Sequence, residues 1–348
     1  MLFYILWFGA LVILFLFSDS VRSGPYKKLF RWLGLLIAII VSAFRYNVGK
    51  DYFSYRNSII NLDSNYHNSE PLNKALFYFS HWIGLPQFYF IITTLIIFLL
   101  VHSTVKKYSN YYTLSFLIFL SFPLFFANSL TIIRQFIAMS VIFYSVKYIL
   151  YERNFFKFLF LVVLASGFHY SAVAAIPIFF LNKAKIKSWT YILFFSFPIV
   201  FKRLLIYIIV NYAPSYSKYV VYKYGLNAGG GKAIYLFLVV CCYLLLFKKN
   251  IIAVSEKNRL YLNSIILGSI IYWSLLDFGH VGMRLASFYL MFCIILLPNT
   301  IKIVVKGNRK IVVYGAYLFC FLVFLVTFGV GLKNGESSYI PYKFIFQK

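Results

Sequence analysis

Long apolar runs, separated by short basic connections, constrain this chain more than any other feature of its sequence. The runs 88–102 and 311–330 contain no Asp, Glu, Lys or Arg, and a helix of about 20 apolar residues crosses the hydrocarbon core of a bilayer. Lipid offers backbone groups no hydrogen-bond partner, so such runs must be helical. An all-α polytopic membrane protein is expected, with 1–348 forming a single integral membrane domain. We predict about 12 transmembrane helices, near 2–17, 29–44, 88–102, 111–127, 131–150, 155–167, 170–182, 188–210, 233–247, 259–276, 284–298 and 311–330.

Composition excludes the main soluble classes. Of the 348 residues, 62% are hydrophobic and 12% are charged, whereas soluble domains carry about 25% charged residues. The formal charge of +26 at first suggests a nucleic-acid partner. However, the basic residues recur in pairs and triplets between apolar runs, as they do in the loops of membrane proteins. We therefore expect these residues to lie beside the lipid bilayer and predict no nucleic-acid partner.

The distribution of Lys and Arg predicts the orientation of the helices. Most of the 34 basic residues fall in six short connections, the first at 18–31, and positive residues collect on the cytoplasmic side. The amino terminus and the longer outer loops near 45–87 and 211–232 are then expected on the opposite side. Chemically mixed residues gather there, which predicts an extracytoplasmic site. They are Arg45, Asp51, Arg56, Glu70, Arg134, His169, Asp277, His280 and Arg284.

The first outer loop opens with a segment, 45–56, that mixes cations, a carboxylate and aromatic rings such as Tyr52 and Tyr55. A site for a sugar and a phosphate needs this mixture. Aromatic faces stack on sugar rings, Arg forks hold phosphate oxygens, and a carboxylate can accept a proton. An aromatic belt with anchoring Arg residues at the membrane interface would have the same composition. The residues alone favour neither interpretation.

A cation and an amide, Arg134 and Gln135, stand at the start of an otherwise apolar helix. An Arg inside a membrane span costs about 2.5–3.5 kcal/mol at mid-bilayer and less near the ends. Such a residue usually faces a polar cavity or a partner, although its side chain can also extend to the lipid headgroups. The pattern therefore predicts either a binding residue or an anchor.

Two further polar groups interrupt apolar runs. His169 lies between 155–167 and 170–182, which we interpret as a helical pair hinged near Gly167. A single His in such a place is more often a structural group than a catalyst. The other group follows the 259–276 run, and it forms either a site or only a hydrogen-bonded turn. It consists of Asp277, His280 and Arg284.

Several short fragments extend over nearly the whole chain in a recognisable order. They are Arg45-x3-Gly49-x-Asp51-Tyr52-x2-Tyr55, Glu70-Pro71, Arg134-Gln135-x2-Ala138, His169-x-Ser171-Ala172, Arg284 before an aromatic-rich helix, and the tail Tyr339-Ile340-Pro341-Tyr342-Lys343. Together they resemble the EpsG/Wzy-type family of bacterial polysaccharide (O-antigen and exopolysaccharide) polymerases. The chain departs from this family in having only modest outer loops, where O-antigen polymerases often carry a long one.

The resemblance implies a membrane glycosyltransferase with a GT-C-like, all-helical architecture in the bacterial plasma membrane, its site facing the exterior. The growing glycan would move from undecaprenyl diphosphate onto a newly flipped lipid-linked repeat unit. Both donor and acceptor would then be undecaprenyl-diphosphate-linked oligosaccharides, with a flippase and a chain-length regulator as candidate partners. No cofactor or metal is predicted, since no nucleotide-binding signature, clustered carboxylates or Cys/His spacing appears.

This chemistry suggests roles for individual residues. A departing diphosphate develops negative charge that positioned Arg residues stabilise, which favours Arg134 and Arg284 with Arg45 in support. The acceptor hydroxyl needs a base, for which Asp51 and His169 are the candidates. The remaining candidates for substrate binding are Tyr52, Tyr55, Arg56, Glu70, Gln135, Asp277 and His280.

Two other functions fit a similar sequence. A transporter or flippase of lipid-linked oligosaccharide would share the helices and the basic residues, but it should line a cavity with polar groups through the full bilayer depth. A polysaccharide ligase would move finished chains to a different acceptor. The polar residues gather on one predicted face, which favours the polymerase.

Overall fold

Most of the described chain is α-helical, as the apolar runs predict. The computed structural model describes residues 1–21, 24–196, 231–278, 280–333 and 338–347, with Leu204, Tyr207 and Asn211. The helices of the amino-terminal half are α1 (Leu2–Ser20), α2 (Pro25–Ala43), α3 (Tyr52–Asn61), α4 (Ser64–His67), α5 (Pro71–Trp82), α6 (Gln87–Tyr108), α7 (Tyr112–Ser121), α8 (Phe126–Thr131), α9 (Ile133–Tyr144), α10 (Val146–Leu150), α11 (Phe155–Ser166), the 3₁₀ helix η1 (Tyr170–Ala175) and α12 (Ile178–Leu181).

The carboxy-terminal half continues the helical pattern up to a short final tail. Its helices are η3 (Gly231–Ala233), α15 (Ile234–Leu246), α16 (Lys248–Val254), α17 (Asn258–Ser274), η4 (Leu276–Phe278), α18 (His280–Leu290), α19 (Cys293–Thr300), η5 (Ile301–Ile303), η6 (Lys306–Asn308), α20 (Arg309–Lys333) and η7 (Ile345–Gln347). The expected helical pair around Gly167 is confirmed, because α11 ends at Ser166 and η1 begins at Tyr170.

Several of these helices are long and apolar enough to cross a membrane. In the described part of the chain they are Leu2–Ser20, Gln87–Tyr108, Ile133–Leu150 and Lys306–Gly329. Two bent pairs, α15 with α16 at 74° and α18 with α19 at 51°, raise the number of candidate spans from 4 to 6. The fold is therefore that of an all-α polytopic membrane protein, while the count of 12 helices and the GT-C-like arrangement stay predictions.

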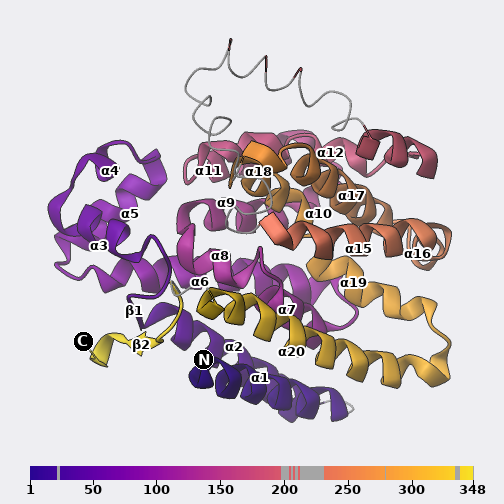
Figure 1. Cartoon of the computed structure of the whole chain (residues 1–348), viewed down its shortest axis with the longest axis horizontal. Helices are drawn as coiled ribbons and strands as arrows, with labels where there is room; N and C mark the ends of the chain where they lie inside the picture. The colour runs from indigo at the N-terminus through magenta and orange to yellow at the C-terminus, as the bar shows by residue number, and fades with distance from the viewer. Residues whose placement is uncertain are drawn as a thin grey trace.

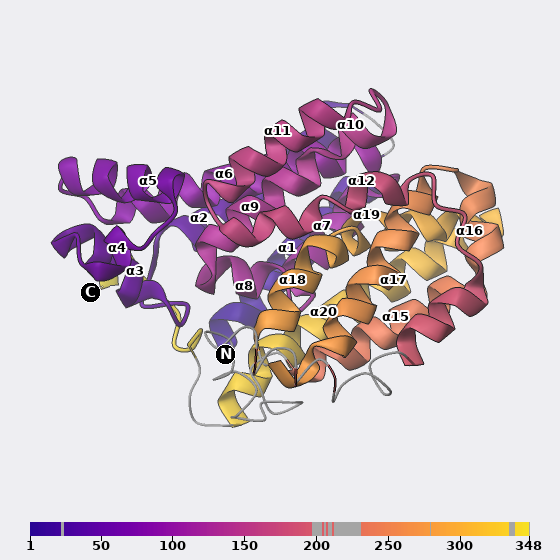
Figure 2. The same cartoon turned by 90° about the horizontal axis from the view of Figure 1, so that it is seen from above.

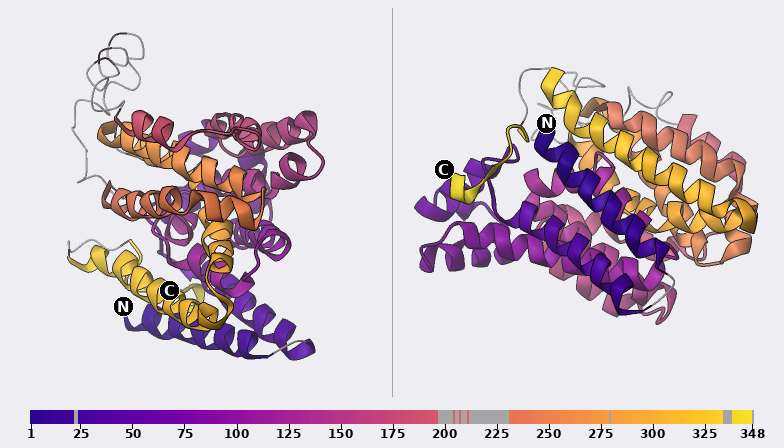
Figure 3. Two further views of the ribbon diagram at one scale, coloured as in Figure 1. Left: turned by 90° about the vertical axis from the view of Figure 1, so that its right-hand side faces the viewer. Right: turned by 90° about the horizontal axis from the view of Figure 1, so that it is seen from below.

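The helices pack in layers through aromatic side chains. In the layer formed by α1, α2 and α20 (Figures 1 and 3), the ring of Phe8 stacks on that of Phe324 with centroids 4.1 Å apart. A central layer contains α6, α7 and α9, and α6 contacts both α2 and α9. Ring pairs of this kind contribute about 0.5–1.5 kcal/mol each beyond their burial. The high aromatic content thus serves the contacts between helices.

One end of the molecule carries three helices that lie apart from the main layers. The expected outer loop 45–87 is largely helical, since it contains α3, α4 and α5. Local capping explains this, because the Asp63 side chain accepts hydrogen bonds from two backbone N–H groups of α4 and Pro71 begins α5. Figures 1 and 2 place these helices opposite α16 and the start of α20. The other expected outer loop, 211–232, lies almost entirely outside the described residues.

The carboxy-terminal tail returns to this same end and is fastened there. Strand β1 (Arg45–Tyr46) pairs antiparallel with β2 (Lys343–Phe344), with Arg45 opposite Phe344. The N–H of Gly49 donates to the carbonyl of Ser338 over 2.7 Å. Gly49 has φ +100°, and a Cβ on it would lie 2.2 Å from the carbonyl oxygen of Leu130. Only glycine fits there, because both the backbone angle and the contact exclude a side chain.

We predict that Gly49→Ala destabilises the protein by at least about 2 kcal/mol, since it combines a strained φ with a backbone collision. Gly24→Ala is a matched control, because Gly24 has φ +108° with nothing within 4 Å of its added Cβ. Thermal unfolding of the purified proteins in detergent measures both. Equal losses in the two variants would mean that the contact with Leu130 contributes nothing.

Candidate active site

Residues from four separate segments meet at a small cavity close to α3 and the start of α9. The cavity has a volume of about 40 Å³. Most of its wall is formed by residues that the sequence analysis singled out, and only Ile132 is new. The lining residues are Asp51, Tyr55, Ile132, Arg134, Gln135, His169 and Arg284. Segments up to 233 positions apart in sequence therefore contribute to one site.

A buried carboxylate connects two of these lining residues. Glu70 Oε2 lies 2.7 Å from Arg134 Nη1, and Glu70 Oε1 lies 2.8 Å from His169 Nδ1. The Glu70 side chain is only 5% exposed. Burial, the largest influence, raises the pKa of Glu70, but the hydrogen bond from His169 and the charge of Arg134 outweigh it, so the pKa is lowered overall. Glu70 is therefore a carboxylate at neutral pH.

The contact with Glu70 also determines the tautomer of His169. An ionised carboxylate only accepts hydrogen bonds, so the proton lies on Nδ1 of His169. The other ring nitrogen, Nε2, is then an acceptor whenever the ring is neutral. A backbone hydrogen bond keeps Glu70 close to His169, because the N–H of Leu72 donates to the carbonyl of Gly167 over 2.9 Å. The start of α5 thus brings Glu70 to the break between α11 and η1.

A helix start increases the positive potential at the cavity. The chain breaks at Ile132, between α8 and α9, so Arg134 lies in the first turn of α9. Helix N-termini carry a partial positive charge and favour anions. A positively charged guanidinium at a helix N-terminus is unfavourable by itself, and the negative charge of the Glu70 carboxylate compensates for it. The Arg134 side chain is 32% exposed, which leaves some of its N–H groups accessible from the cavity.

Two other lining residues, Gln135 and Arg284, are hydrogen-bonded to each other, and each also has one buried polar atom without a partner among the described residues. Nε2 of Gln135 donates to the backbone carbonyl of Arg284 over 2.7 Å. Oε1 of Gln135 and Nε of Arg284 are buried and have no hydrogen-bond partner among the described residues. Buried polar atoms of this kind are rare in native proteins, since each costs about 1–3 kcal/mol. Their presence at a cavity wall is typical of a binding site.

The acid in the cavity wall, Asp51, lies among cations. Asp51 has a raised pKa, because burial, the largest influence, outweighs the opposing charges of Arg284, Lys50 and Arg134. His280 lowers the same pKa more weakly and is therefore also close. The cavity is thus lined both by a carboxylate that can take a proton, Asp51, and by two cations that stabilise its charged form, Arg134 and Arg284.

The structure does not bring every predicted residue to this cavity. Arg45 is 1% exposed, and its guanidinium donates to the backbone carbonyls of Ser42, Val48 and Leu130. Burial lowers the pKa of Arg45 to about 10. It joins α2, β1 and α8 from within the protein and is not part of the cavity wall.

The other predicted residues outside the wall have varied surroundings. The ring of Tyr52 stacks on that of Phe90 at 4.6 Å, and its hydroxyl donates to Gln87. Arg56 is half-buried on α3. Asp277 lies in η4, and His280 is an exposed residue that begins α18. The segment 277–284, predicted to form either a site or only a hydrogen-bonded turn, is thus helical over most of its length.

Sequence reasoning also missed functional neighbours. Gln87 donates to the backbone carbonyls of Ala43 and Arg45, which fixes the segment that leads to Asp51. The sequence did contain a signal for this structural role, because Gln87 is a polar side chain at the start of an apolar run. Lys50 acts on Asp51 simply by being its neighbour in sequence.

These features define a class before any comparison. The chain is a polytopic membrane protein with a cationic site, containing carboxylates and a histidine, where several helices begin or break. The EpsG family model matches residues 27–344, and the chain belongs to this family. Family membership implies a polysaccharide polymerase-type function. No curated protein matches the chain, and no solved structure matches it.

We predict that Glu70→Gln lowers stability in a pH-dependent way. A group whose pKa is lowered in the folded state adds stability above its unfolded pKa, about 4.5 for Glu, and this stability is lost as pH falls through the folded value. The variant should be less stable than the parent by up to about 3 kcal/mol at pH 7. The difference should shrink as pH falls below about 4.5.

Thermal unfolding across this pH range measures the difference. Glu152→Gln is the control, because the Glu152–Lys157 pair is exposed on both sides and such pairs contribute little. A Glu70→Gln deficit that stayed constant with pH would show that the carboxylate charge is not what stabilises the site.

Proposed function

We propose that this protein is a polysaccharide polymerase. It transfers the growing glycan from undecaprenyl diphosphate onto a new lipid-linked repeat unit at the outer face of the bacterial plasma membrane. The observation that carries the proposal is the meeting of two arginines, a histidine and a carboxylate at one cavity, formed by Arg134, Arg284, His169 and Asp51. Family membership supports the same conclusion.

The arginines suit the departure of a diphosphate. As the bond between the anomeric carbon and the diphosphate oxygen breaks, its electron pair moves to that oxygen and negative charge grows there. Guanidinium forks can hold such oxygens in pairs, and the N-terminus of α9 adds positive potential. Arg134 and Arg284 are placed on the same cavity wall, so both could act on one leaving group.

We assign the general base to His169. Glu70 holds the proton on Nδ1, which leaves Nε2 to take the proton of the acceptor hydroxyl as its oxygen attacks the anomeric carbon. The imidazolium that forms lies beside the Glu70 carboxylate, which stabilises it. In this assignment Glu70 positions His169, and Asp51, which lines the same cavity, orients the acceptor hydroxyl.

The competing functions fit the described residues less well. A flippase needs polar groups through the full depth of the bilayer, whereas this ionic cluster gathers at the starts and breaks of helices near α3. A ligase would use similar chemistry with a different acceptor. The polymerase role also brings a flippase and a chain-length regulator as proposed partners, because the repeat unit must arrive and the chain must end.

We predict that Arg134→Lys and Arg284→Lys each reduce polymerisation by about tenfold or more, and that Arg→Ala costs about 10²–10³. Lysine keeps the charge but loses the fork. Arg153→Lys is the control, because Arg153 is exposed and lies outside the cavity. The measurement is the product ladder formed by the reconstituted protein from its native lipid-linked repeat unit. Full ladders from both Lys variants would assign the two arginines to anchoring.

We also predict that His169→Ala lowers the turnover number by about 10²–10⁴ with a smaller effect on substrate binding. Asp51→Asn should instead impair acceptor use more than turnover. His67→Ala serves as the control, since His67 is exposed on α4 at the same end of the molecule. A ladder of normal length and rate from His169→Ala would exclude it as the base, and single transfers in place of ladders would identify a ligase.

A further inference from the structure

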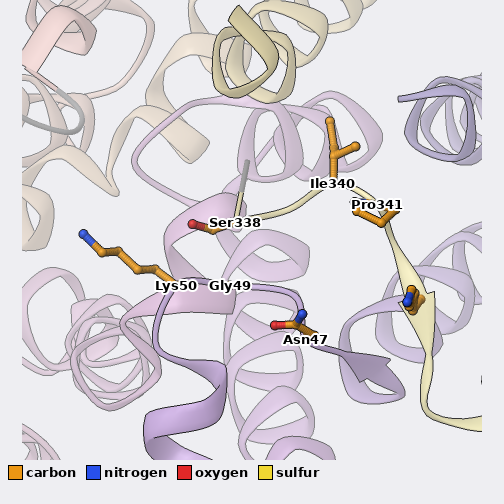
Figure 4. A pocket seen from close by; sticks show the side chains of 7 residues that line it. Asn47, Gly49, Lys50, Ser338, Ile340 and Pro341 are labelled. Atoms are coloured by element: carbon orange, nitrogen blue, oxygen red, sulfur yellow. The ribbon is translucent and has the colours of Figure 1, made fainter. Parts of the chain in front are cut away.

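A second and larger cavity lies beside the site. Its volume is about 330 Å³, within the range of about 300–1,000 Å³ that small-molecule sites occupy. Figure 4 shows the segment after β1 on one side of it and the carboxy-terminal tail on the other. It is lined by Asn47, Gly49, Lys50, Ser338, Ile340, Pro341 and Lys343.

This cavity adjoins the proposed catalytic one through the backbone. Lys50 lines the larger cavity and Asp51 lines the smaller, and consecutive Cα atoms are about 3.8 Å apart. The two cavities therefore lie close enough for one glycan to contact both. The smaller cavity, at about 40 Å³, has room for the reacting groups but not for a sugar chain.

The walls of the larger cavity are held in place by the tail. The pairing of β1 with β2 and the hydrogen bond from Gly49 N–H to the Ser338 carbonyl fasten its two sides. Buried Arg45 supports the first side from behind by bonding the Val48 carbonyl. Because this wall is already ordered in the free protein, less free energy is lost to ordering it when a ligand binds.

The lining combines positive charge with neutral polar and apolar groups. Lys50 and Lys343 bring ammonium groups, Asn47 and Ser338 bring an amide and a hydroxyl, and the seven lining residues include no carboxylate. Ammonium groups are compact charges that bind single anionic oxygens. The apolar surfaces of Ile340 and Pro341 suit the C–H face of a sugar ring.

We propose that this cavity is a glycan subsite that selects an acidic polysaccharide, with Lys50 from the segment after β1 and Lys343 from β2 binding carboxylates of different sugars. The proposal rests on the proposed polymerase function. A carboxylate-bearing sugar is favoured over the carrier diphosphate because the guanidinium forks that suit a diphosphate lie in the neighbouring cavity. The larger cavity offers point charges and ring-sized space instead.

A binding assay tests the subsite separately from catalysis. The purified full-length protein in detergent is titrated with trigalacturonate, which carries carboxylates, and with neutral maltotriose. Trigalacturonate should bind at least tenfold more tightly than maltotriose, and added salt should weaken it. Lys50→Gln and Lys343→Gln, which keep most of the side-chain length, should each weaken trigalacturonate binding about tenfold.

Lys74→Gln is the matched control, because Lys74 lies on α5 at the same end of the molecule but does not line the cavity. Equal binding of the two oligosaccharides would overturn the proposal, and so would equal loss in Lys74→Gln, which would indicate the general field of a strongly basic protein. Inorganic pyrophosphate that displaced trigalacturonate from Lys50 and Lys343 at matched concentration would instead assign a phosphate site. Ladder synthesis by the wild type separates these failures from failure of the polymerase role.

Discussion

The buried carboxylate of Glu70 is the interaction on which the candidate site depends. It joins a cation in the first turn of α9 to a histidine at the break between α11 and η1, and it does so from the residue before α5. Charges removed from water are tolerated only when they are paired and hydrogen-bonded. Without Glu70, Arg134 would face the positive end of its own helix with no compensation. One carboxylate thus fixes the relative positions of three helical elements.

Interrupted helices explain why polar chemistry is possible in so apolar a chain. The bundle itself is built from stacked rings and offers few polar groups, but each break frees backbone donors and acceptors that need partners. The breaks at Ile132 and Gly167 supply these groups beside α3. Glycine at 167 permits the close approach, since a Cβ there would lie 2.7 Å from Leu72. The site is therefore a property of helix ends, and the long spans mainly position it.

The sequence allowed much of this to be predicted, and the errors have physical causes. Apolar runs predicted the helices, and mixed polar residues between them predicted most of the cavity wall, because uncompensated charge is too costly to be placed there without reason. Arg45 shows the limit. Its sequence context resembles that of a ligand-binding Arg, yet its guanidinium serves three backbone carbonyls, and such long-range pairing with Leu130 leaves no local pattern. The helices within 45–87 were missed because short capped helices lack a long apolar period.

The charges of the site balance in a way that suits group transfer. Two guanidinium groups, of Arg134 and Arg284, meet two carboxylates, of Glu70 and Asp51, around an imidazole. Glu70 and Tyr55 both hydrogen-bond the Arg134 guanidinium. Its side chain is nevertheless 32% exposed, so part of the guanidinium stays accessible to a phosphate oxygen. In the proposed mechanism the imidazole takes a proton, and the added positive charge is adjacent to Glu70 and opposes the negative charge that grows on the leaving group. In the proposed mechanism, the same carboxylate that compensates the half-buried Arg134 also stabilises the protonated base that the reaction creates.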